Sequence, residues 1–246
     1  MTSFDTIIYD KRDAIAHIRL DRPHVLNAFN VAMRDDLFQA IQAVQDDPEV
    51  RVVIISGEGT SFCAGADLTE FGTAPSPTIA RDVRWQRDVW GLFLGLSKPA
   101  IAAIHGYCIG SGLEIAMLCD FRIASDDARF SMPEVALGMV PAAGGTQTLP
   151  RTVGVPSALD LLLTARQVGA SEALALGLVG RVVPAGSLLQ EAHTMAEGLL
   201  QVDQDALQAV KESVMRGAEM GLEDALELES RLAISAMGYS RGSNSD

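Results

Sequence analysis

Two uninterrupted apolar runs constrain the fold of this chain more than any other feature of its sequence. Residues 52–56 (VVIIS) and 100–105 (AIAAIH) lack alternating polar positions. Strands that are buried on both faces have this pattern, and they belong to parallel sheets covered by helices. Segments with helical spacing separate and follow the two runs. The sequence therefore predicts an α/β core.

Weaker signals complete the expected core. Asn30 is placed to cap a helix whose apolar face carries Met33, Leu37, Ile41 and Val44. The other expected elements are strands over 6–9, 14–20 and 121–125 with a turn at 10–13, a mobile breaker cluster at 72–77, and helices over 79–96, 111–119, from 133, and after the glycine-rich stretch 141–146.

The chain becomes almost wholly helical after residue 184. Helices are expected over 187–200, 203–216 and 222–236, and the polar end of the chain is expected to be disordered. The predicted organisation is an α/β core with the active site over residues 1–184, a helical region over 185–237, and a disordered tail over 238–246.

Composition and charge exclude several classes of function. The formal net charge of −13 argues against a nucleic-acid partner, which requires a basic surface. No apolar run is long enough to span a membrane, and the first residues do not resemble a signal peptide. Three cysteines without C-x-x-C spacing indicate reduced thiols, and the four histidines are scattered along the sequence. We therefore expect a cytoplasmic protein without a membrane partner or metal site.

Two glutamates in apolar surroundings are the strongest candidates for chemistry. Glu114 and Glu134 each stand near the start of an expected helix. Burial raises the pKa of a carboxyl group, so a pair in one pocket would form an acid/base system. Each also has a structural interpretation. Ser111 and Glu114 fit a capping box, and an acid after Pro133 is favoured by the helix dipole. Spacing alone leaves both interpretations open.

Two segments of small residues flank these acids. The turn after residue 105 leads into the helix at 111, and helix-start N–H groups can hold a phosphate or an oxyanion. Its glycines match neither a Walker loop nor a G-x-G-x-x-G site. Residues 61–68 (SFCAGADL) would let the backbone approach a ligand closely, or form a tight turn capped by Asp67. A nucleophile at Cys108 or His105 lacks the G-x-S-x-G elbow. Both residues are expected to be buried and structural.

Several short motifs occur in one order and at one spacing, and together they resemble the crotonase family, the enoyl-CoA hydratases and isomerases. The resemblance extends from about residue 25 to residue 232. It is carried by VLNA at 25–28, SFCAGADL at 61–68, KPAIAAIHGY at 98–107, GSGLE at 110–114, CD at 119–120, PE at 133–134, LG at 137–138 and GGTQ at 144–147.

The resemblance implies a crotonase-like spiral of ββα units with a helical C-terminal region that packs trimers, often paired into hexamers. It implies an acyl-CoA thioester substrate in fatty acid metabolism, with no separate cofactor. The thioester oxygen would lie between the backbone N–H groups of Ala66 and Ser111. Both acid positions of the hydratases are filled, by Glu114 and Glu134.

The expected activity is that of an enoyl-CoA hydratase, which adds water syn across the double bond of a trans-2-enoyl-CoA. Glu114 would activate the water and Glu134 would protonate the α-carbon. The alternatives are an enoyl-CoA isomerase or another lyase of the family, and a thioester or β-diketone hydrolase is less well supported.

The resemblance also implies a substrate path. Its residues are Val25, Leu26, Ala28, Phe62, Ala64, Gly65, Asp67, Leu68, Gly110, Pro133, Met139 and Ala142, and the acyl chain is expected along Leu68, Trp85, Trp90 and Met139. Three positions depart from the family pattern. Ser111 and Ala142 stand where glycine is frequent, and Met132 stands where glutamine is common.

Overall fold

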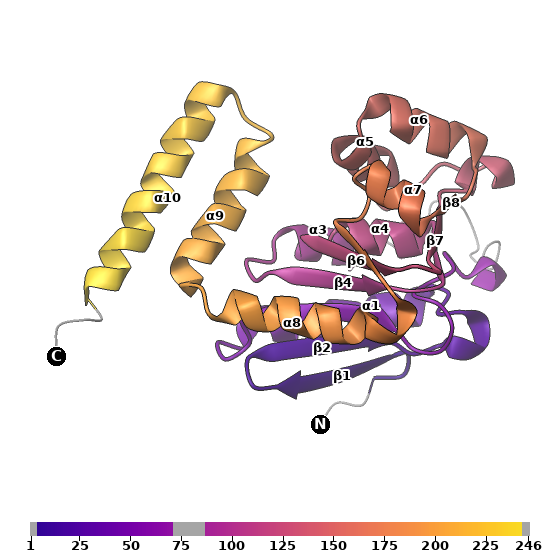
Figure 1. Cartoon of the computed structure of the whole chain (residues 1–246), viewed down its shortest axis with the longest axis horizontal. Helices are drawn as coiled ribbons and strands as arrows, with labels where there is room; N and C mark the ends of the chain where they lie inside the picture. The colour runs from indigo at the N-terminus through magenta and orange to yellow at the C-terminus, as the bar shows by residue number, and fades with distance from the viewer. Residues whose placement is uncertain (1–3, 71–86, 243–246) are drawn as a thin grey trace.

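A central six-stranded sheet organises the molecule (Figure 1). The computed structural model describes residues 4–70 and 87–242, so the cluster at 72–77 and much of the helix expected over 79–96 lie outside the described residues. The strand order is β1-β2-β3-β4-β6-β9, and every neighbouring pair except β1–β2 is parallel. The strands are β1 (Ile7–Arg12), β2 (Ile15–Leu20), β3 (Val52–Gly57), β4 (Ala100–Ile104), β6 (Phe121–Ser125) and β9 (Arg181–Val183).

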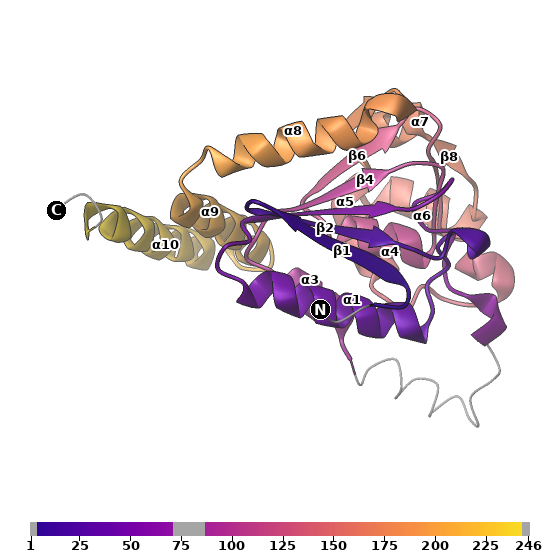
Figure 2. The same cartoon turned by 90° about the horizontal axis from the view of Figure 1, so that it is seen from below.

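The central strand β3 is buried on both faces, as its apolar run predicts. Val53 and Ile55 belong to the main core beneath α1 (Val31–Asp46) and α4 (Ser111–Met117). Val52 and Ile54 point the other way and pack with Ala192 of α8 (Leu188–Leu200). Figure 2 shows α8 along one face of the sheet and α1 along the other. The parallel sheet expected from the two apolar runs is confirmed.

The first hairpin turns later than the sequence suggested. The turn expected at 10–13 lies at Asp13 and Ala14, and β1 continues to Arg12, which pairs with Ile15. Asp13 adopts a left-handed backbone conformation (φ 52°), which makes a two-residue turn possible. Lys11, a strand residue, donates a 2.8 Å hydrogen bond to Asp47. The charged residues at positions 10–12 therefore lie on the edge strand β1 rather than in a loop.

A second, smaller sheet lies beside the first and was not expected element by element. It contains β5 (Tyr107–Ile109), β7 (Arg129–Ser131) and β8 (Val168–Gly169). The chain passes from β4 of the large sheet to β5 of the small sheet and then into α4. It repeats this order through β6, β7 and the 3₁₀ helix η3 (Glu134–Leu137). These repeats are the ββα units that the resemblance implied. Strands of two or three residues are too short to give a periodic signal.

Helices cover the sheets. Asn30 caps α1 as predicted, because its Oδ1 accepts a 2.9 Å hydrogen bond from the Met33 N–H. The four apolar residues expected on one face of α1 are all fully buried. The remaining helices are α3 (Val89–Leu94), α5 (Gly145–Val153), α6 (Val155–Thr164), α7 (Ala170–Ala175), α9 (Gln204–Gly217), α10 (Leu222–Gly242), and the 3₁₀ helices η1 (Pro23–Val25), η2 (Leu68–Glu70) and η4 (Ala185–Ser187).

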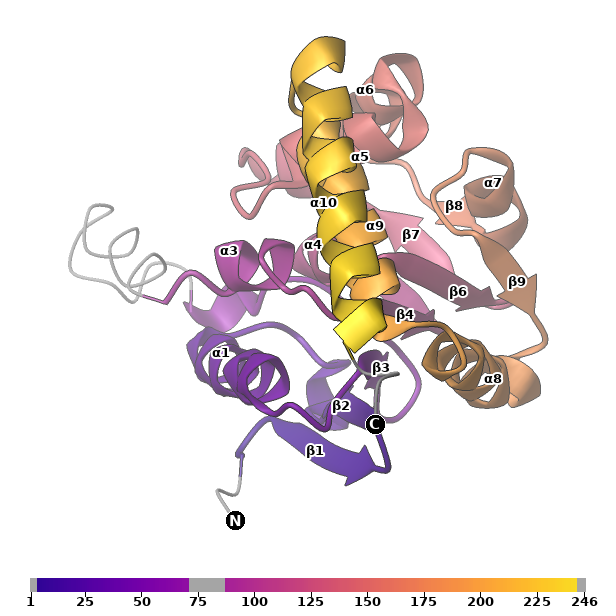
Figure 3. The same cartoon turned by 90° about the vertical axis from the view of Figure 1, so that its left-hand side faces the viewer.

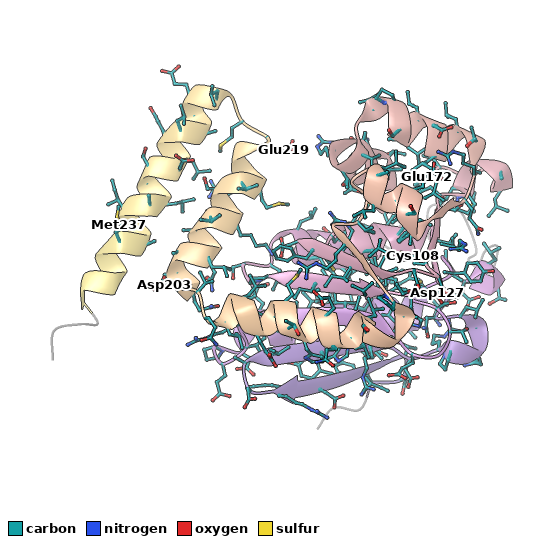
Figure 4. The ribbon with its side chains drawn as sticks, in the orientation of Figure 1. Cys108, Asp127, Glu172, Asp203, Glu219 and Met237 are labelled. Carbon is teal, nitrogen blue, oxygen red and sulfur yellow. The ribbon has the colours of Figure 1, made fainter. Side chains whose placement is uncertain are left out.

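Of the three C-terminal helices, α8 belongs to the core, while α9 and α10 project away from it. Helix α8 packs on the large sheet, so the helical region expected from residue 185 begins as part of the core. Helices α9 and α10 form a hairpin that stands away from the sheets, with α10 alongside α9 (Figures 1 and 3). Figure 4 marks Asp203 and Glu219 at the two ends of α9 and Met237 on α10.

An ion pair ties this hairpin to the core. Lys211 of α9 contacts Asp120 at 2.7 Å, just before β6. Helix α10 continues to Gly242, so the first residues of the tail expected to be disordered from 238 are helical. Within the described residues, no helix is both long and apolar enough to cross a bilayer.

Candidate active site

Two backbone segments run side by side at the edge of the small sheet. The Cys63 N–H donates to the Tyr107 carbonyl at 2.9 Å, and the Ile109 N–H donates to the Cys63 carbonyl at 2.9 Å. Further along, Gly65 and Gly110 touch: a Cβ added to Gly110 would lie 3.8 Å from the Gly65 Cα. Both glycines have positive φ, which an L side chain adopts only with strain. The glycines therefore allow the close approach of the two loops.

The Ala66 N–H lies on the first loop, and its direction is fixed by the neighbouring carbonyl. The Phe29 N–H donates a 2.8 Å hydrogen bond to the Gly65 carbonyl. In a trans peptide the C=O and N–H bonds point in opposite directions, so the Ala66 N–H points away from Phe29. Among the described residues, this N–H donates to no other group of the protein.

The Ser111 N–H occupies the matching position on the second loop. The Gly110 carbonyl accepts the first helical hydrogen bond of α4, from the Glu114 N–H at 2.9 Å. Ser111 is the first residue of α4, so its N–H has no partner within the helix and carries the positive end of the helix dipole. Gly110 is the N-cap, and no side chain of the described residues caps this helix. The capping box weighed for Ser111 and Glu114 is therefore wrong.

Glu114 points across to a neighbouring loop. Its side chain is only 2% exposed. Its Oε1 accepts hydrogen bonds from the Ala143 N–H at 3.1 Å and from the Gly145 N–H at 2.9 Å. Hydrogen bonds donated to a carboxylate favour the ionised form. Glu114 thus joins α4 to the glycine-rich stretch before α5.

Glu134 has different surroundings. It begins η3 directly after Pro133, which is the N-cap rather than the expected first helical residue. The carboxyl group lies against the start of α4, since a Cβ on Gly110 would be 2.6 Å from Glu134 Oε1. Its Oε2 is buried and has no hydrogen-bond partner in the part of the chain that is described. Burial raises the pKa of Glu134, as predicted for a carboxyl group near hydrocarbon.

The structure brings both glutamates to the first turn of α4. Glu134 contacts the Gly110 position, and Glu114 lies one turn into the same helix. The two N–H groups of Ala66 and Ser111 lie on the adjoining loops. Two carboxyl groups and two backbone donors therefore lie on adjoining segments around the start of α4. Such an arrangement can stabilise an oxyanion and transfer protons beside it.

The residues expected to line a substrate path are placed in different ways. Val25 and Leu26 are exposed at η1, beside the first loop, and the Ala64 N–H donates to the Leu26 carbonyl at 3.0 Å. Leu68 is 55% exposed at the start of η2. Ala28 and Ala64 are partly buried in these loops.

The other path residues divide between the site and the core. Met139 is partly buried and donates its N–H to the Glu134 carbonyl at 2.9 Å, while Ala142 is exposed. Phe62 is fully buried in the core, so its side chain supports the loop from beneath instead of lining a path. Trp90 likewise packs on the core, 5.3 Å from the Phe29 ring, and Trp85 lies outside the described residues.

Asp67, expected at the ligand, turns away toward Arg22. Its Oδ2 lies 2.9 Å from Arg22, and the Thr69 N–H donates to its Oδ1 at 3.1 Å, so the expected tight turn is also present. Sequence reasoning missed Arg22, and it gave Asn27 no separate role. Asn27 is fully buried and donates to the Ser61 carbonyl at 2.8 Å. The only signal in the sequence is that Arg22 and Asn27 are polar and lie on either side of the segment 23–26.

The buried thiols and His105 form no nucleophilic site. Cys108 lies in the interior (Figure 4), and burial raises the pKa of the Cys63 thiol to about 11. His105 Nε2 is 3.1 Å from the Gly59 carbonyl, so the expected hydrogen bond is present, but His105 is only partly buried rather than buried as expected. His17 and His193 lie far apart in the sequence, but their rings meet edge to face, with centroids 5.7 Å apart. Among the described residues, no group of three or more metal-ligating side chains forms.

The fold and this site define the class of protein. A family model described as enoyl-CoA hydratase/isomerase matches residues 10–240, and the chain belongs to that family. A crotonyl-CoA hydratase of Syntrophomonas wolfei is 38% identical over 228 residues, which is 92% of this chain and 88% of that protein. A short-chain-enoyl-CoA hydratase of Clostridium acetobutylicum is 37% identical over 227 residues, covering 92% and 87%.

Solved structures agree with the family and the fold. The enoyl-CoA hydratase of Bacillus anthracis superposes with a TM-score of 0.89 at 34% identity, covering 93% of this chain and 90% of that one. A Thermobifida fusca protein solved in complex with CoA gives a TM-score of 0.90 at 32% identity, covering 96% and 95%. The crotonase-like fold expected from the sequence motifs is confirmed.

Proposed function

We propose that this chain is an enoyl-CoA hydratase that adds water syn across the double bond of a trans-2-enoyl-CoA. One observation carries the proposal: the Glu134 carboxyl group lies against Gly110, the N-cap of α4, and Glu114 stands in the first turn of the same helix with two backbone N–H groups on its carboxyl oxygen. Hydration requires one group to take a proton from water and another to give a proton to carbon. The related proteins named as hydratases support the same reaction.

The backbone donors supply the first part of the mechanism. The thioester oxygen would accept hydrogen bonds from the Ala66 and Ser111 N–H groups. Charge that moves onto this oxygen in the transition state is stabilised there, and one such donor changes the rate by about 10²–10³-fold. Withdrawal of electrons through the conjugated system makes the β-carbon electrophilic. Because the donors are backbone groups, a serine at position 111 supplies the same N–H as a glycine would.

The two carboxyl groups supply the proton transfers. Glu114 accepts a proton from water while the water oxygen bonds to the β-carbon. The electron pair of the double bond moves toward the thioester as an enolate, and the α-carbon then takes the proton of Glu134. Syn addition requires the two carboxyl groups to act on the same face of the double bond. After one turnover Glu114 carries the proton and Glu134 is ionised. Proton transfer through solvent restores the starting state.

The site needs no separate cofactor in this mechanism, because CoA is part of the substrate. Val25, Leu26 and Leu68 are exposed apolar residues beside the Ala66 loop, and we assign them to the substrate path. Met139 donates its N–H to the Glu134 carbonyl, and Ala142 precedes Ala143, whose N–H donates to Glu114, so we assign both residues to the acyl chain.

Crotonyl-CoA tests the proposal. Hydration removes the conjugated double bond, so the absorbance of the enoyl thioester should disappear when purified protein is added. An isomerase would instead create that absorbance from a 3-enoyl-CoA. Activity with the 3-enoyl-CoA and none with crotonyl-CoA would contradict the proposal and indicate an isomerase. Release of free CoA, detected with a thiol reagent, would favour a hydrolase.

Surface and thiol chemistry support a proposal for the assembly and the compartment. Large apolar side chains are exposed along the α9–α10 hairpin, among them Val210, Val214, Leu222, Ile234 and Met237. Many large apolar side chains exposed on one hairpin indicate a surface that is covered by a partner. We therefore propose a homotrimer or a dimer of trimers, to be checked by light scattering during size-exclusion chromatography. The free, buried thiols suit a cytoplasmic protein.

A further inference from the structure

The loop that carries the Ala66 N–H is fastened to one neighbouring segment on both sides of Ala66. On one side, the Phe29 N–H donates to the Gly65 carbonyl at 2.8 Å. On the other, the Asp67 N–H donates to the Phe29 carbonyl, also at 2.8 Å. A rotation of the Gly65–Ala66 peptide would break the first bond. The direction of the Ala66 N–H therefore depends on where residues 28 and 29 lie.

One guanidinium group joins these two segments. Arg22 donates from one terminal nitrogen to the Ala28 carbonyl at 2.5 Å and to Asp67 Oδ2 at 2.9 Å. Its own backbone is fixed, because the Arg22 N–H donates to Asn27 Oδ1 at 2.8 Å. The side chains of Arg22 and Asp67 are only 15% and 11% exposed. Ion pairs shielded from water in this way hold their geometry better than surface pairs do.

We propose that the Arg22–Asp67 ion pair is the positioning device of the first oxyanion donor. The pair does not touch the reacting atoms. It holds residues 28–29 against residues 65–67 and so keeps the Ala66 N–H pointing at the thioester oxygen. This inference rests on the proposed function, because it assigns that N–H to the thioester. The second donor needs no such device, since the helical hydrogen bonds of α4 fix Ser111.

A change in the direction of the Ala66 N–H should affect kcat and the carbonyl stretching frequency of a bound thioester more than it affects KM. A hydrogen bond in the transition state weakens when its donor moves by a fraction of an ångström, so kcat falls. Substrate binding depends mainly on contacts with the rest of CoA, so KM changes little. The carbonyl bond of a bound thioester is also less polarised. Its stretching frequency therefore moves back toward the value in solution, an effect that a loss of overall stability does not produce.

The test uses Asp67→Asn, which keeps an oxygen for Thr69 and removes the charge facing Arg22. We expect kcat for crotonyl-CoA to fall on the order of tenfold with a KM change below about threefold. The infrared carbonyl band of bound butyryl-CoA, which cannot be hydrated, should return part of the way toward its solution frequency. Arg22→Gln should give the same two results, and the double variant should add little, because each change breaks the same link.

The matched control is Asp120→Asn. Asp120 forms a comparably buried ion pair with Lys211 at 2.7 Å, where α9 meets the core. Its loss should lower the free energy of unfolding and leave the carbonyl band in place. Wild-type kcat and an unchanged band in both Asp67→Asn and Arg22→Gln would overturn the positioning role alone. A wild-type protein that binds butyryl-CoA without any shift of the band would instead overturn the oxyanion assignment and the proposed function with it.

Discussion

The start of α4 and the start of η3 each present a glutamate, and the two surroundings differ in their supply of hydrogen-bond donors. Glu114 is almost completely buried, yet the N–H groups of Ala143 and Gly145 point at its carboxylate. Glu134 is less deeply buried, but its Oε2 has no donor among the described residues. The two carboxyl groups therefore differ in their hydrogen-bond partners, and burial raises the pKa of Glu134. Burial alone does not decide which acid holds the proton, because fixed N–H donors can replace water.

The largest effect is expected from Glu114→Gln, which removes the base and keeps its shape. The amide oxygen still accepts from the Gly145 N–H, so the fold should be retained. Activity toward crotonyl-CoA should fall about 10³-fold in kcat, within the range of general acid–base catalysis. Circular dichroism serves as the control for folding. Hydration surviving at near wild-type rate would remove Glu114 from the mechanism.

The donors to Glu114 are tested by Gly145→Ala. The added Cβ would meet the Met132 side chain and lie 2.9 Å from Glu114 Oε1 and 3.0 Å from Pro141 Cβ. Because the loop must shift, we expect kcat to fall about 10²-fold. Gly198→Ala in α8 is the matched control, since nothing lies within 4 Å of its Cβ. That change should leave activity intact and raise stability by roughly 0.4–1 kcal/mol. Equal kinetics in the two variants would contradict the role given to the loop.

The pH dependence of hydration tests the other side of the comparison. Burial raises the pKa of Glu134, and the proposed mechanism uses its protonated form. The value of kcat/KM should therefore fall as pH rises through this raised pKa, by about tenfold per pH unit above it. A series of initial rates with crotonyl-CoA would show this limb. A rate that increases through the same range would reverse the roles of the two glutamates.

The smallest effect is a change in stability. The folded-state pKa of Glu134 is raised above its ordinary value of 4.5, so the folded protein binds more protons than the unfolded chain between these two values. Stability due to this group is complete below its ordinary pKa and is lost as pH rises through the raised one. Glu134→Gln removes this loss. The free energy of unfolding of the variant, minus that of the wild type, should therefore increase between roughly pH 4 and pH 8. Urea unfolding should show an increase of no more than about 1 kcal/mol, since partial exposure of Glu134 to solvent screens the cost of its charge. A difference in unfolding free energy that stays constant across this pH range would contradict the raised pKa of Glu134.

Much of the fold was predictable because its signals are local and strong. The runs at β3 and β4 are apolar throughout, and the Asn30 cap with its apolar face locates α1. The small sheet was not predictable from pattern, because β8 has only two residues and gains its stability from its neighbours. The position of the first turn depended on a left-handed Asp13, which residue preferences do not specify.

The candidate site was predictable as a set of residues but not as an arrangement. The motifs around Ala66, Ser111, Glu114 and Glu134 indicated the right segments. They did not indicate that Asp67 turns toward Arg22, that Phe62 lies in the core, or that Gly110 is the cap of α4. Each of these depends on contacts between residues distant in the sequence, to which spacing along the chain is insensitive.

The sequence by itself determined the α/β class, the family, and the presence of two acids in apolar surroundings, because periodicity and motif order are properties of neighbouring residues. Only the tertiary structure decided how those acids differ. A carboxylate becomes a better base or a better acid according to the donors around it. The donors to Glu114 come from a loop about thirty residues away along the chain, and Glu134 Oε2 has none among the described residues. Folding places those N–H groups beside Glu114 and buries Glu134 Oε2 without a described donor, and neither outcome is visible in the sequence around each acid.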